Sequence, residues 1–300
     1  MEKKINGTEV SKILYQELRK YILKQTQKPN IVDISIGDDF GSLKYAEMKK
    51  NKIEKETGFG FESIHYDEIS KEELIGYINE LNETPNINGI MLQLPLPSYL
   101  SEYEREILDT IDFTKDVDGL TSRSAGLLMV GEDCLIPCTP LGIITLLKAY
   151  DIPLEGKNVS IINRSNIVGK PLEQLFLREN ATTTVCHSKT IDLESITSKS
   201  DILVAAPNKR EFITEKYVKE GAIVIDVGVH ENEQHKIAGD VDFNSVYQKS
   251  SLITPPIGGV GPMTIAMLAF NTAKSLYGKE IDTVLHNGIE IARKTLKRTR

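Results

Sequence analysis

Residues 158–176 read NVSIINRSNIVGKPLEQLF, and this stretch decides the expected fold. The apolar run at its start has the length of a buried strand, and the spacing of its second half is typical of a helix. Three further apolar runs follow at 182–187, 201–206 and 222–229, with helical patterns between them. Continuous apolar strands that alternate with helices predict a parallel sheet covered on both faces.

The first half of the chain repeats this alternation. Its patterns predict strands at 31–36, 62–66 and 89–94, and helices over 8–24, 42–57 and 70–81. Further helices are predicted over 140–150, from about 168, over 262–276 and over 279–297. At 300 residues the chain has room for about two domains. We therefore expect an α/β protein with an N-terminal α/β domain and a Rossmann-like doubly wound nucleotide domain, divided near Thr139-Pro140.

Composition excludes several classes of protein. The net charge is −7, which argues against a nucleic-acid-binding face. The three cysteines are too few for a disulfide framework, and such low cysteine content is typical of proteins in a reducing cytosol. Their spacing does not match that of metal ligands. No apolar run approaches the ~18 residues of a membrane helix, and the N-terminus lacks the apolar core of a secretory signal. We therefore expect a cytoplasmic protein without a metal, nucleic-acid or membrane partner.

The turn after residue 162 is a candidate nucleotide site, although it lacks the G-x-G-x-x-G pattern and keeps only Gly169. Arg164 follows the strand directly, where an anion would lie. Ser165 and the N–H groups at the helix start are suited to a phosphate. An interdomain ion pair is the alternative role for Arg164.

The end of the next strand bears on the choice of cofactor. It reads Cys186-His187-Ser188-Lys189, without the acidic residue that binds the ribose 2′-hydroxyl of NAD. Basic and hydroxyl groups there favour the 2′-phosphate of NADP. Capping of the strand end is the alternative role for His187. A second glycine-rich segment, IGGVGPMT at 257–264, permits close approach of backbone to a ligand or forms a plain tight turn.

Four side chains of the first half are candidates for chemistry. Tyr45 and Lys49 are spaced i, i+4 and share a helix face. Gln93 interrupts an apolar strand, so its amide is either structural or directed at a ligand. Asp118 precedes Gly119 in a loop that it either caps or equips for binding.

These residues belong to motifs that resemble the methylenetetrahydrofolate dehydrogenase/cyclohydrolase family over nearly the whole chain. The motifs are S-x-x-Y-x-x-x-K at 42–49, GIMLQLPLP at 89–97, KDVDGLT at 115–121, PCTPLGI at 137–143, RSNIVGKP at 164–171, HSKT at 187–190, KEGAIVIDVG at 219–228, GDVDF at 239–243 and GGVGPMT at 258–264. Asn163 stands where this family commonly has glycine, and 206–209 replace its usual glycine-containing turn.

The resemblance implies a folate-binding catalytic domain of residues 1–139 plus 272–300 and an NADP-binding domain of residues 140–271. It implies oxidation of 5,10-methylenetetrahydrofolate to 5,10-methenyltetrahydrofolate by hydride transfer to NADP, then hydrolysis to 10-formyltetrahydrofolate. Typical members are cytosolic homodimers of one-carbon metabolism that supply purine biosynthesis. A dehydrogenase without the hydrolytic step, and a nucleotide-binding protein with an inactive folate cleft, are the alternatives. A shikimate-type dehydrogenase would leave QLPLP and KDVDGLT unexplained.

The resemblance also implies roles for particular residues. Lys49 would move the proton in hydrolysis, Gln93 would align Lys49 with water, and Asp118 would bind the pterin. Lys50 is a rival for the lysine role, because the stretch up to Gly58 is one residue longer than expected. The other implied residues are Tyr45, Gly259 and Pro262 for the substrate, and Arg164, Ser165, Ile167, His187, Ser188 and Val229 for the cofactor.

Overall fold

The computed structural model describes residues 3–37, 40–231 and 237–299, without the side chains of 40–45 and 299, and divides the chain into two compact units. The first unit comprises Leu14–Cys138 and Ile265–Gly288. The second comprises Met1–Ile13, Thr139–Thr264 and Ile289–Arg300. The main division therefore falls at residue 138, whereas both ends of the chain belong to the second unit. Helices α1 (Gly7–Ile22), α10 (Val260–Tyr277) and α11 (Glu280–Thr299) contribute residues to both units.

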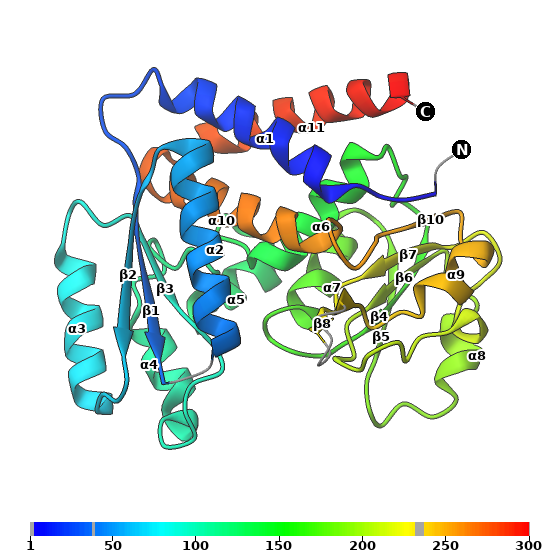
Figure 1. Ribbon diagram of the computed structural model, residues 1–300, viewed down its shortest axis with the longest axis horizontal. Helices are drawn as coiled ribbons and strands as arrows, with labels where there is room; N and C mark the ends of the chain where they lie inside the picture. Colours follow the sequence, from blue (N-terminus) through cyan, green and yellow to red (C-terminus); the bar gives the residue numbers. More distant parts are fainter. Residues whose placement is uncertain (1–2, 38–39, 232–236, 300) are drawn as a thin grey trace. The chain divides into compact units, whose positions relative to one another are not determined.

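The first unit contains a parallel sheet of three strands in the order β2-β1-β3 (Figure 1). These strands are β1 (Asn30–Ile36), β2 (Gly60–Tyr66) and β3 (Gly89–Leu92). Side chains alternate between the faces of a strand. Val32, Ile34 and Ile36 of β1 therefore share one face, where they join a core with α3 (Lys71–Glu83) and α4 (Glu104–Thr110). Asp33 and Ser35 lie on the opposite face of β1, and this face carries the candidate site described below.

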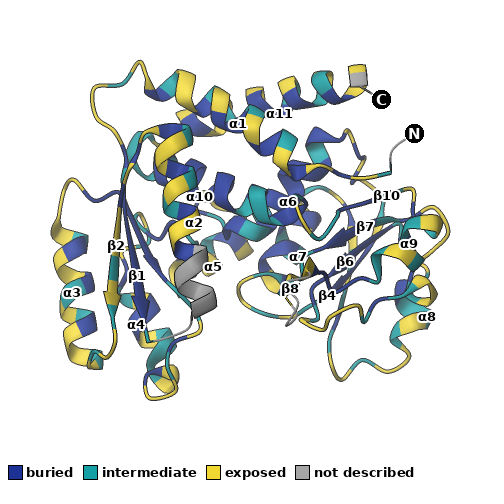
Figure 2. Cartoon of the chain, in the orientation of Figure 1, coloured by how far each residue is buried: buried dark blue, intermediate teal, exposed yellow. Residues whose placement is uncertain are grey.

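Helix α3 shows how local sequence fixes an element. The Ser70 hydroxyl accepts a hydrogen bond from Glu73 N, and the Glu73 carboxylate accepts one from Ser70 N. This capping box satisfies two N–H groups at the helix start and confirms the predicted beginning. Leu74, Ile78 and Leu81 are buried on the inner side, while the outer side is exposed (Figure 2).

The second unit contains a parallel sheet of five strands in the order β10-β7-β6-β4-β5. The strands are β4 (Asn158–Ile162), β5 (Thr182–Cys186), β6 (Ile202–Ala205), β7 (Ile223–Asp226) and β10 (Leu252–Ile253). The associated helices are α6 (Cys138–Ala149), α7 (Gly169–Arg178), α8 (Leu193–Thr197) and α9 (Phe243–Lys249). The predicted doubly wound fold is confirmed. Because β4 pairs with both β5 and β6, the strand order reverses there, and such a switch point is where ligands bind.

Several elements differ from the sequence prediction. The sequence patterns did not anticipate α5 (Ser122–Val130) or the antiparallel pair β8 (His230–Glu231) and β9 (Ile237–Ala238). Two short 3₁₀ helices occupy Ser101–Tyr103 and Glu215–Tyr217. Helix α2 spans Phe40–Thr57, two residues more than expected at its start. The Leu94–Pro95 peptide bond is cis.

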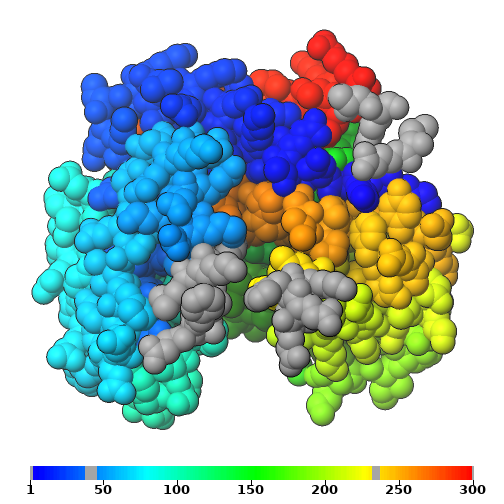
Figure 3. Space-filling view, viewed as in Figure 1, coloured from blue at the N-terminus to red at the C-terminus, as the bar shows by residue number. Residues whose placement is uncertain are grey.

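The basic end of α11 lies at the surface, where it is drawn in red in Figure 3. Lys294, Lys297 and Arg298 are exposed, and Lys297 Nζ lies 2.6 Å from a carboxylate oxygen of Asp151. The end of the helix is thus solvated and partly ion-paired. Within the described part of the chain, no helix is both long and apolar enough to span a membrane.

Candidate active site

Lys49 is buried because of its place on α2. Ala46, Lys49, Ile53 and Thr57 follow helical spacing and are all buried, so they form the inward stripe of this helix. The Lys49 side chain is only 5% exposed, and its Nζ lies 3.7 Å from the sulfur of Met91 on β3. Lys50 is one position off the stripe and only half-buried. This placement supports Lys49 rather than Lys50 as the functional lysine.

A carboxylate on β1 shares the sheet face that Lys49 meets. Asp33 is the register partner of Met91, and laterally paired residues of neighbouring strands point to the same face. Gln93 follows β3 two residues after Met91 and donates from Nε2 to Asp33 Oδ1 at 2.6 Å. Burial raises the pKa of the Asp33 carboxyl, opposed by the Lys49 ammonium and by the Gln93 hydrogen bond. The half-buried amide therefore has a specific partner that the sequence patterns did not identify.

Asp118 supplies a second carboxylate near Lys49. Burial raises the pKa of Asp118 to about 6, although the charge of Lys49 opposes this rise. Asp118 also hydrogen-bonds with the Cys138 thiol, whose sulfur lies 3.3 Å from the Val117 carbonyl. Asn271 of α10 donates from Nδ2 to the carbonyls of Val117 and Ile136, both at 2.8 Å. These contacts fix the backbone just before Asp118 and tie it to the segment that precedes α6.

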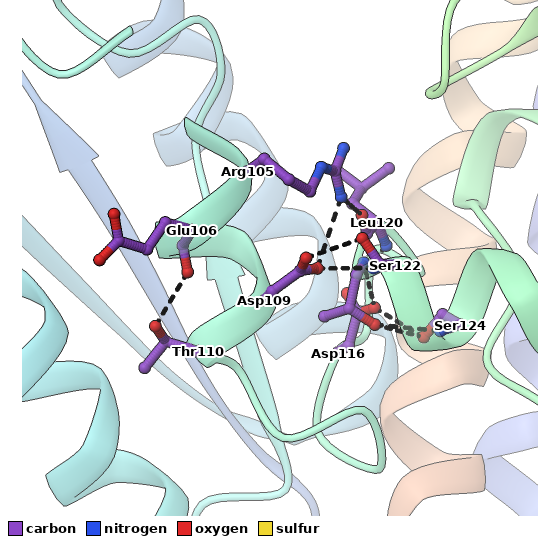
Figure 4. Close-up of polar contacts among 9 residues, drawn as sticks. Arg105, Glu106, Asp109, Thr110, Asp116, Leu120, Ser122 and Ser124 are labelled. Atoms are coloured by element: carbon purple, nitrogen blue, oxygen red, sulfur yellow. Dashed lines mark hydrogen bonds and ion pairs between the residues drawn. The ribbon is translucent and has the colours of Figure 1, made fainter. Parts of the chain in front are cut away.

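The loop that carries Asp118 is anchored by Asp116, as Figure 4 shows. The Asp116 carboxylate accepts hydrogen bonds from the backbone of Leu120 and Thr121 and from the Ser124 hydroxyl, at 2.8–3.0 Å. A carboxylate that accepts several N–H and O–H bonds can hold a turn firmly. The loop and the start of α5 are thereby locked together. Asp109 adds two bonds to Ser122, at 2.6 and 2.7 Å.

The first unit thus brings together three of the residues predicted from sequence: Lys49, Gln93 and Asp118. The side chain of Tyr45 lies outside the described residues. Asp33 and Cys138 were missed. The signal for Asp33 was present, since an acidic residue interrupts the apolar strand IVDISI. One cation among carboxylates and an amide can position a water molecule and move a proton.

The second unit has a cavity of about 410 Å³ at the carboxyl ends of β4, β5 and β6. Arg164 follows β4, His187 and Ser188 follow β5, and Lys209 lies beyond β6. Among the residues described there, none that lines the cavity is acidic; the lining is Ile162, Asn163, Arg164, His187, Ser188, Thr190, Leu193, Ala206, Pro207, Asn208, Lys209, Phe212 and Tyr217. The volume suits part of a large ligand, and the cations suit an anionic group.

Asn163 organises the turn beneath this cavity. Its Oδ1 accepts from Ser165 N at 2.7 Å and from Gly169 N at 3.0 Å, and its Nδ2 donates to the Ala206 carbonyl at 2.8 Å. The Ser165 hydroxyl accepts from Val168 N at 3.0 Å. Two N–H groups expected for a phosphate are therefore engaged by Asn163. This side chain ties the turn after β4 to the end of β6.

Gly169 is required by close contact rather than by an unusual backbone conformation. A Cβ at this position would lie 2.2 Å from the Asn163 carbonyl oxygen. We expect Gly169→Ala to lower the free energy of unfolding by about 1–3 kcal/mol, because the turn must shift. Gly76→Ala in the interior of α3, where a Cβ meets nothing within 4 Å, is expected to raise it by about 0.5–1 kcal/mol. Urea unfolding measures both; equal effects of the two changes would contradict this explanation.

A buried carboxylate also holds the far wall of the cavity. Asp240 accepts from Asn208 N at 3.2 Å and Lys209 N at 2.7 Å, and its Oδ1 lies 2.7 Å from His230 Nε2. Asp226 holds Asp240 in turn by accepting from its N–H at 2.9 Å. Burial raises the pKa of Asp226 to about 7 despite its backbone hydrogen bonds. The buried Asp240 carboxylate thus fixes the backbone of the segment that follows β6.

The remaining predicted residues lie elsewhere in the second unit. Ser165, Ile167 and Val229 are outside the lining of the cavity, and the side chains of Ile167 and Val229 are largely exposed. Gly259 and Pro262 lie in the loop before α10 and in its first turn. Gly258 O, beside them, accepts from Gly7 N at 2.8 Å. These two residues therefore belong to a different unit from Lys49, Gln93 and Asp118.

Comparison with known proteins gives consistent matches. The model of the tetrahydrofolate dehydrogenase/cyclohydrolase catalytic domain matches residues 5–118, and that of the family's NAD(P)-binding domain matches residues 137–280. Bifunctional protein FolD of Clostridium perfringens strain SM101 is 49% identical over 280 residues, which cover 92% of this chain and 100% of the relative.

Solved structures agree with these matches. The crystal structure of the bifunctional enzyme FolD, a methylenetetrahydrofolate dehydrogenase/cyclohydrolase from Campylobacter jejuni, has a TM-score of 0.87 and 41% identity, and the match covers 90% of this chain and 97% of that one. The Trypanosoma brucei enzyme, solved with NADP cofactor and an inhibitor, has a TM-score of 0.85 and 30% identity, with coverage of 91% and 96%.

Proposed function

Because the chain belongs to the tetrahydrofolate dehydrogenase/cyclohydrolase family, we propose that the cluster around Lys49 carries the chemistry of this family. The protein is an NADP-dependent methylenetetrahydrofolate dehydrogenase and methenyltetrahydrofolate cyclohydrolase. It oxidises 5,10-methylenetetrahydrofolate to 5,10-methenyltetrahydrofolate and hydrolyses this product to 10-formyltetrahydrofolate. The observation that carries the assignment of residues is a buried lysine beside a glutamine and carboxylates in the unit that matches the catalytic domain.

The residues of the second unit fit NADP. The cavity at the switch point presents Arg164 and Lys209 without a described acidic neighbour in its lining. Arg164, His187 and Ser188 would hold the 2′-phosphate, since guanidinium forks and hydroxyls suit phosphate oxygens. Ser165, Ile167 and Val229 would complete the cofactor site from its margins. When bound, NADP supplies the acceptor for the hydride.

In the oxidation step, the protein has to orient the folate rather than transfer protons. Asp118 would accept hydrogen bonds from the donor edge of the pterin, which suits an acceptor-only carboxylate. Tyr45 would stack on the aromatic rings of the folate. Gly259 and Pro262 are also proposed as substrate-binding residues, because both belong to the family motif GGVGPMT.

In the hydrolysis step, water attacks the methenyl carbon, the new carbon–oxygen bond forms, and the bond from that carbon to N5 breaks as N5 takes a proton. Lys49 in its neutral form would accept the proton that the attacking water loses. Gln93 donates through Nε2 to Asp33, so its Oε1 remains to accept a hydrogen bond from the water or from Lys49. The positive charge of the methenyl substrate would favour the neutral form of the lysine.

We further propose a cytoplasmic homodimer that supplies 10-formyltetrahydrofolate to purine biosynthesis. Three buried free cysteines support a reducing compartment. Within the described sheet, β5 pairs with β4 alone, and such an edge can pair with a second copy. The matched ranges 5–118 and 137–280 support a division into an N-terminal folate part and an NADP part. The bounds that we propose for them are 1–139 with 272–300 and 140–271.

The assignment of both steps to one chain can be tested in a single reaction. Purified protein is given 5,10-methylenetetrahydrofolate and NADP, and methenyl- and 10-formyltetrahydrofolate are followed separately. Formation of 10-formyltetrahydrofolate faster than in an enzyme-free blank supports both activities. Accumulation of the methenyl compound at the blank rate of hydrolysis identifies a dehydrogenase alone. NADPH binding without turnover identifies an inactive folate site.

A further inference from the structure

Asp33 is a buried charge in the middle of a sheet. Its side chain is 1% exposed, and its neighbours along β1, Val32 and Ile34, are fully buried apolar residues. Taking a carboxylate out of water costs several kcal/mol unless its partners compensate. An apolar residue would pack here without that cost. The carboxylate therefore lowers the free energy of unfolding relative to an apolar residue at this position. This cost points to a role other than packing.

The two oxygens of Asp33 have different surroundings. Oδ1 accepts the Gln93 amide at 2.6 Å, whereas Oδ2 has no hydrogen-bond partner among the described residues. Register places Asp33 beside Met91, whose sulfur lies 3.7 Å from Lys49 Nζ. The carboxylate thus contacts the amide and shares a sheet face with the lysine, the two groups proposed to act in hydrolysis.

The titratable groups around Lys49 come from several elements. Asp33 faces it from β1, Asp118 from the loop before α5, and the Cys138 thiol from the start of α6. Asp116 adds negative charge beside Asp118, but its oxygens are engaged by the loop backbone and by Ser124. Asp33 is therefore the carboxylate that contacts Gln93 and also acts electrostatically on Lys49.

We propose that Asp33 is a positioning residue for the hydrolytic step, which holds the Gln93 amide in one orientation and places a carboxylate on the sheet face that Lys49 meets. This inference rests on the proposed function of Lys49 and Gln93. A carboxylate favours the charged form of a neighbouring amine. Arrival of the cationic substrate opposes this effect.

Two substitutions separate the charge from the hydrogen bond. Asp33→Asn removes the charge and keeps an oxygen that accepts from Gln93, whereas Asp33→Ser removes the charge and withdraws the accepting oxygen by one bond, out of reach of the Gln93 amide. In each variant the acid limb of kcat/KM for hydrolysis of 5,10-methenyltetrahydrofolate is expected to move to lower pH by roughly one unit. Only Asp33→Ser is expected to lose kcat as well, by roughly tenfold, because Gln93 is released.

The control is Ser35→Ala, on the same face of β1 and also buried, which removes a polar group without changing charge. Its acid limb is expected to coincide with that of the unmodified protein. Thermal unfolding of every sample shows whether it is folded. If Asp33→Ser does not fold, Asp33→Asn alone decides on the charge.

An unmoved acid limb in folded Asp33→Asn, or an equal movement in Ser35→Ala, would overturn the proposal. Failure of both Asp33 variants to fold would also overturn it, since Asp33 would then be structural. The proposed function is tested separately by the unmodified protein. If that protein does not hydrolyse the methenyl compound, the proposed function fails. If it does, and the acid limb of kcat/KM is unchanged in Asp33→Asn, only the role of Asp33 fails.

Discussion

Replacing Lys49 by Met is expected to slow hydrolysis of 5,10-methenyltetrahydrofolate by roughly 10²–10⁴-fold, the usual contribution of a proton-transferring side chain. Methionine keeps the length and the apolar stem of the buried side chain and removes the amine. The dehydrogenase rate should fall less, because hydride transfer depends on orientation. The two rates are measured on one preparation, with methenyltetrahydrofolate supplied directly for the hydrolytic step.

The matched control is Lys50→Met, which makes the same chemical change one position away, at a half-buried residue off the inward stripe of α2. We expect hydrolysis in this variant to stay within about twofold of the unmodified rate, since surface changes usually have small effects. Loss of hydrolysis in Lys50→Met with retention in Lys49→Met would transfer the role to Lys50.

Replacing Arg164 by Ala is expected to lower kcat/KM for NADP by roughly 10–100-fold and to leave the value for NAD within about threefold. Hydrogen bonds to a charged group contribute about 1.5–3 kcal/mol, and NAD lacks the 2′-phosphate that would receive them. Arg164 is exposed at the cavity and forms no ion pair with any described residue, so its removal should leave the fold intact. Initial rates at varied concentrations of each cofactor give both values.

Lys170→Ala provides the control for general loss of positive charge. Lys170 is exposed on α7, donates to Asn166 Oδ1 at 2.7 Å and does not line the cavity. Its removal should change neither cofactor preference nor rate. Equal losses with NADP and NAD in Arg164→Ala would show that the arginine acts on something other than the 2′-phosphate.

Local patterns predicted most of the fold because the strands and helices carry their own signals. The apolar runs gave β4 to β7, and Ser70 with Glu73 gave the start of α3. Helix α5 has a local cap at Thr121, but it escaped prediction because only Ser124 and Leu128 are buried along it and its start is further anchored by Asp116 and Asp109, well before the helix. Such side-chain anchoring leaves no periodic trace in the sequence.

The site was predictable only in part. The motifs marked Lys49, Gln93 and Asp118, and the structure brings them together. The contacts of Asp33 and Asn163 depend on which strands become neighbours. Gln93 reaches Asp33 across paired strands, and Asn163 reaches Ala206 from β4 to β6. A single sequence records neither pairing, so the polar residues in IVDISI and NVSIIN had no assigned partners.

The initial rate of purified protein with 5,10-methylenetetrahydrofolate, measured in parallel with NADP and with NAD, tests the proposed activity and its cofactor preference together. We expect turnover that requires the folate substrate and clearly prefers NADP to NAD. A preference for NAD would keep the family and discard the phosphate site at Arg164 and His187. Absence of turnover with either cofactor, in a folded protein that binds NADPH, would contradict the central claim.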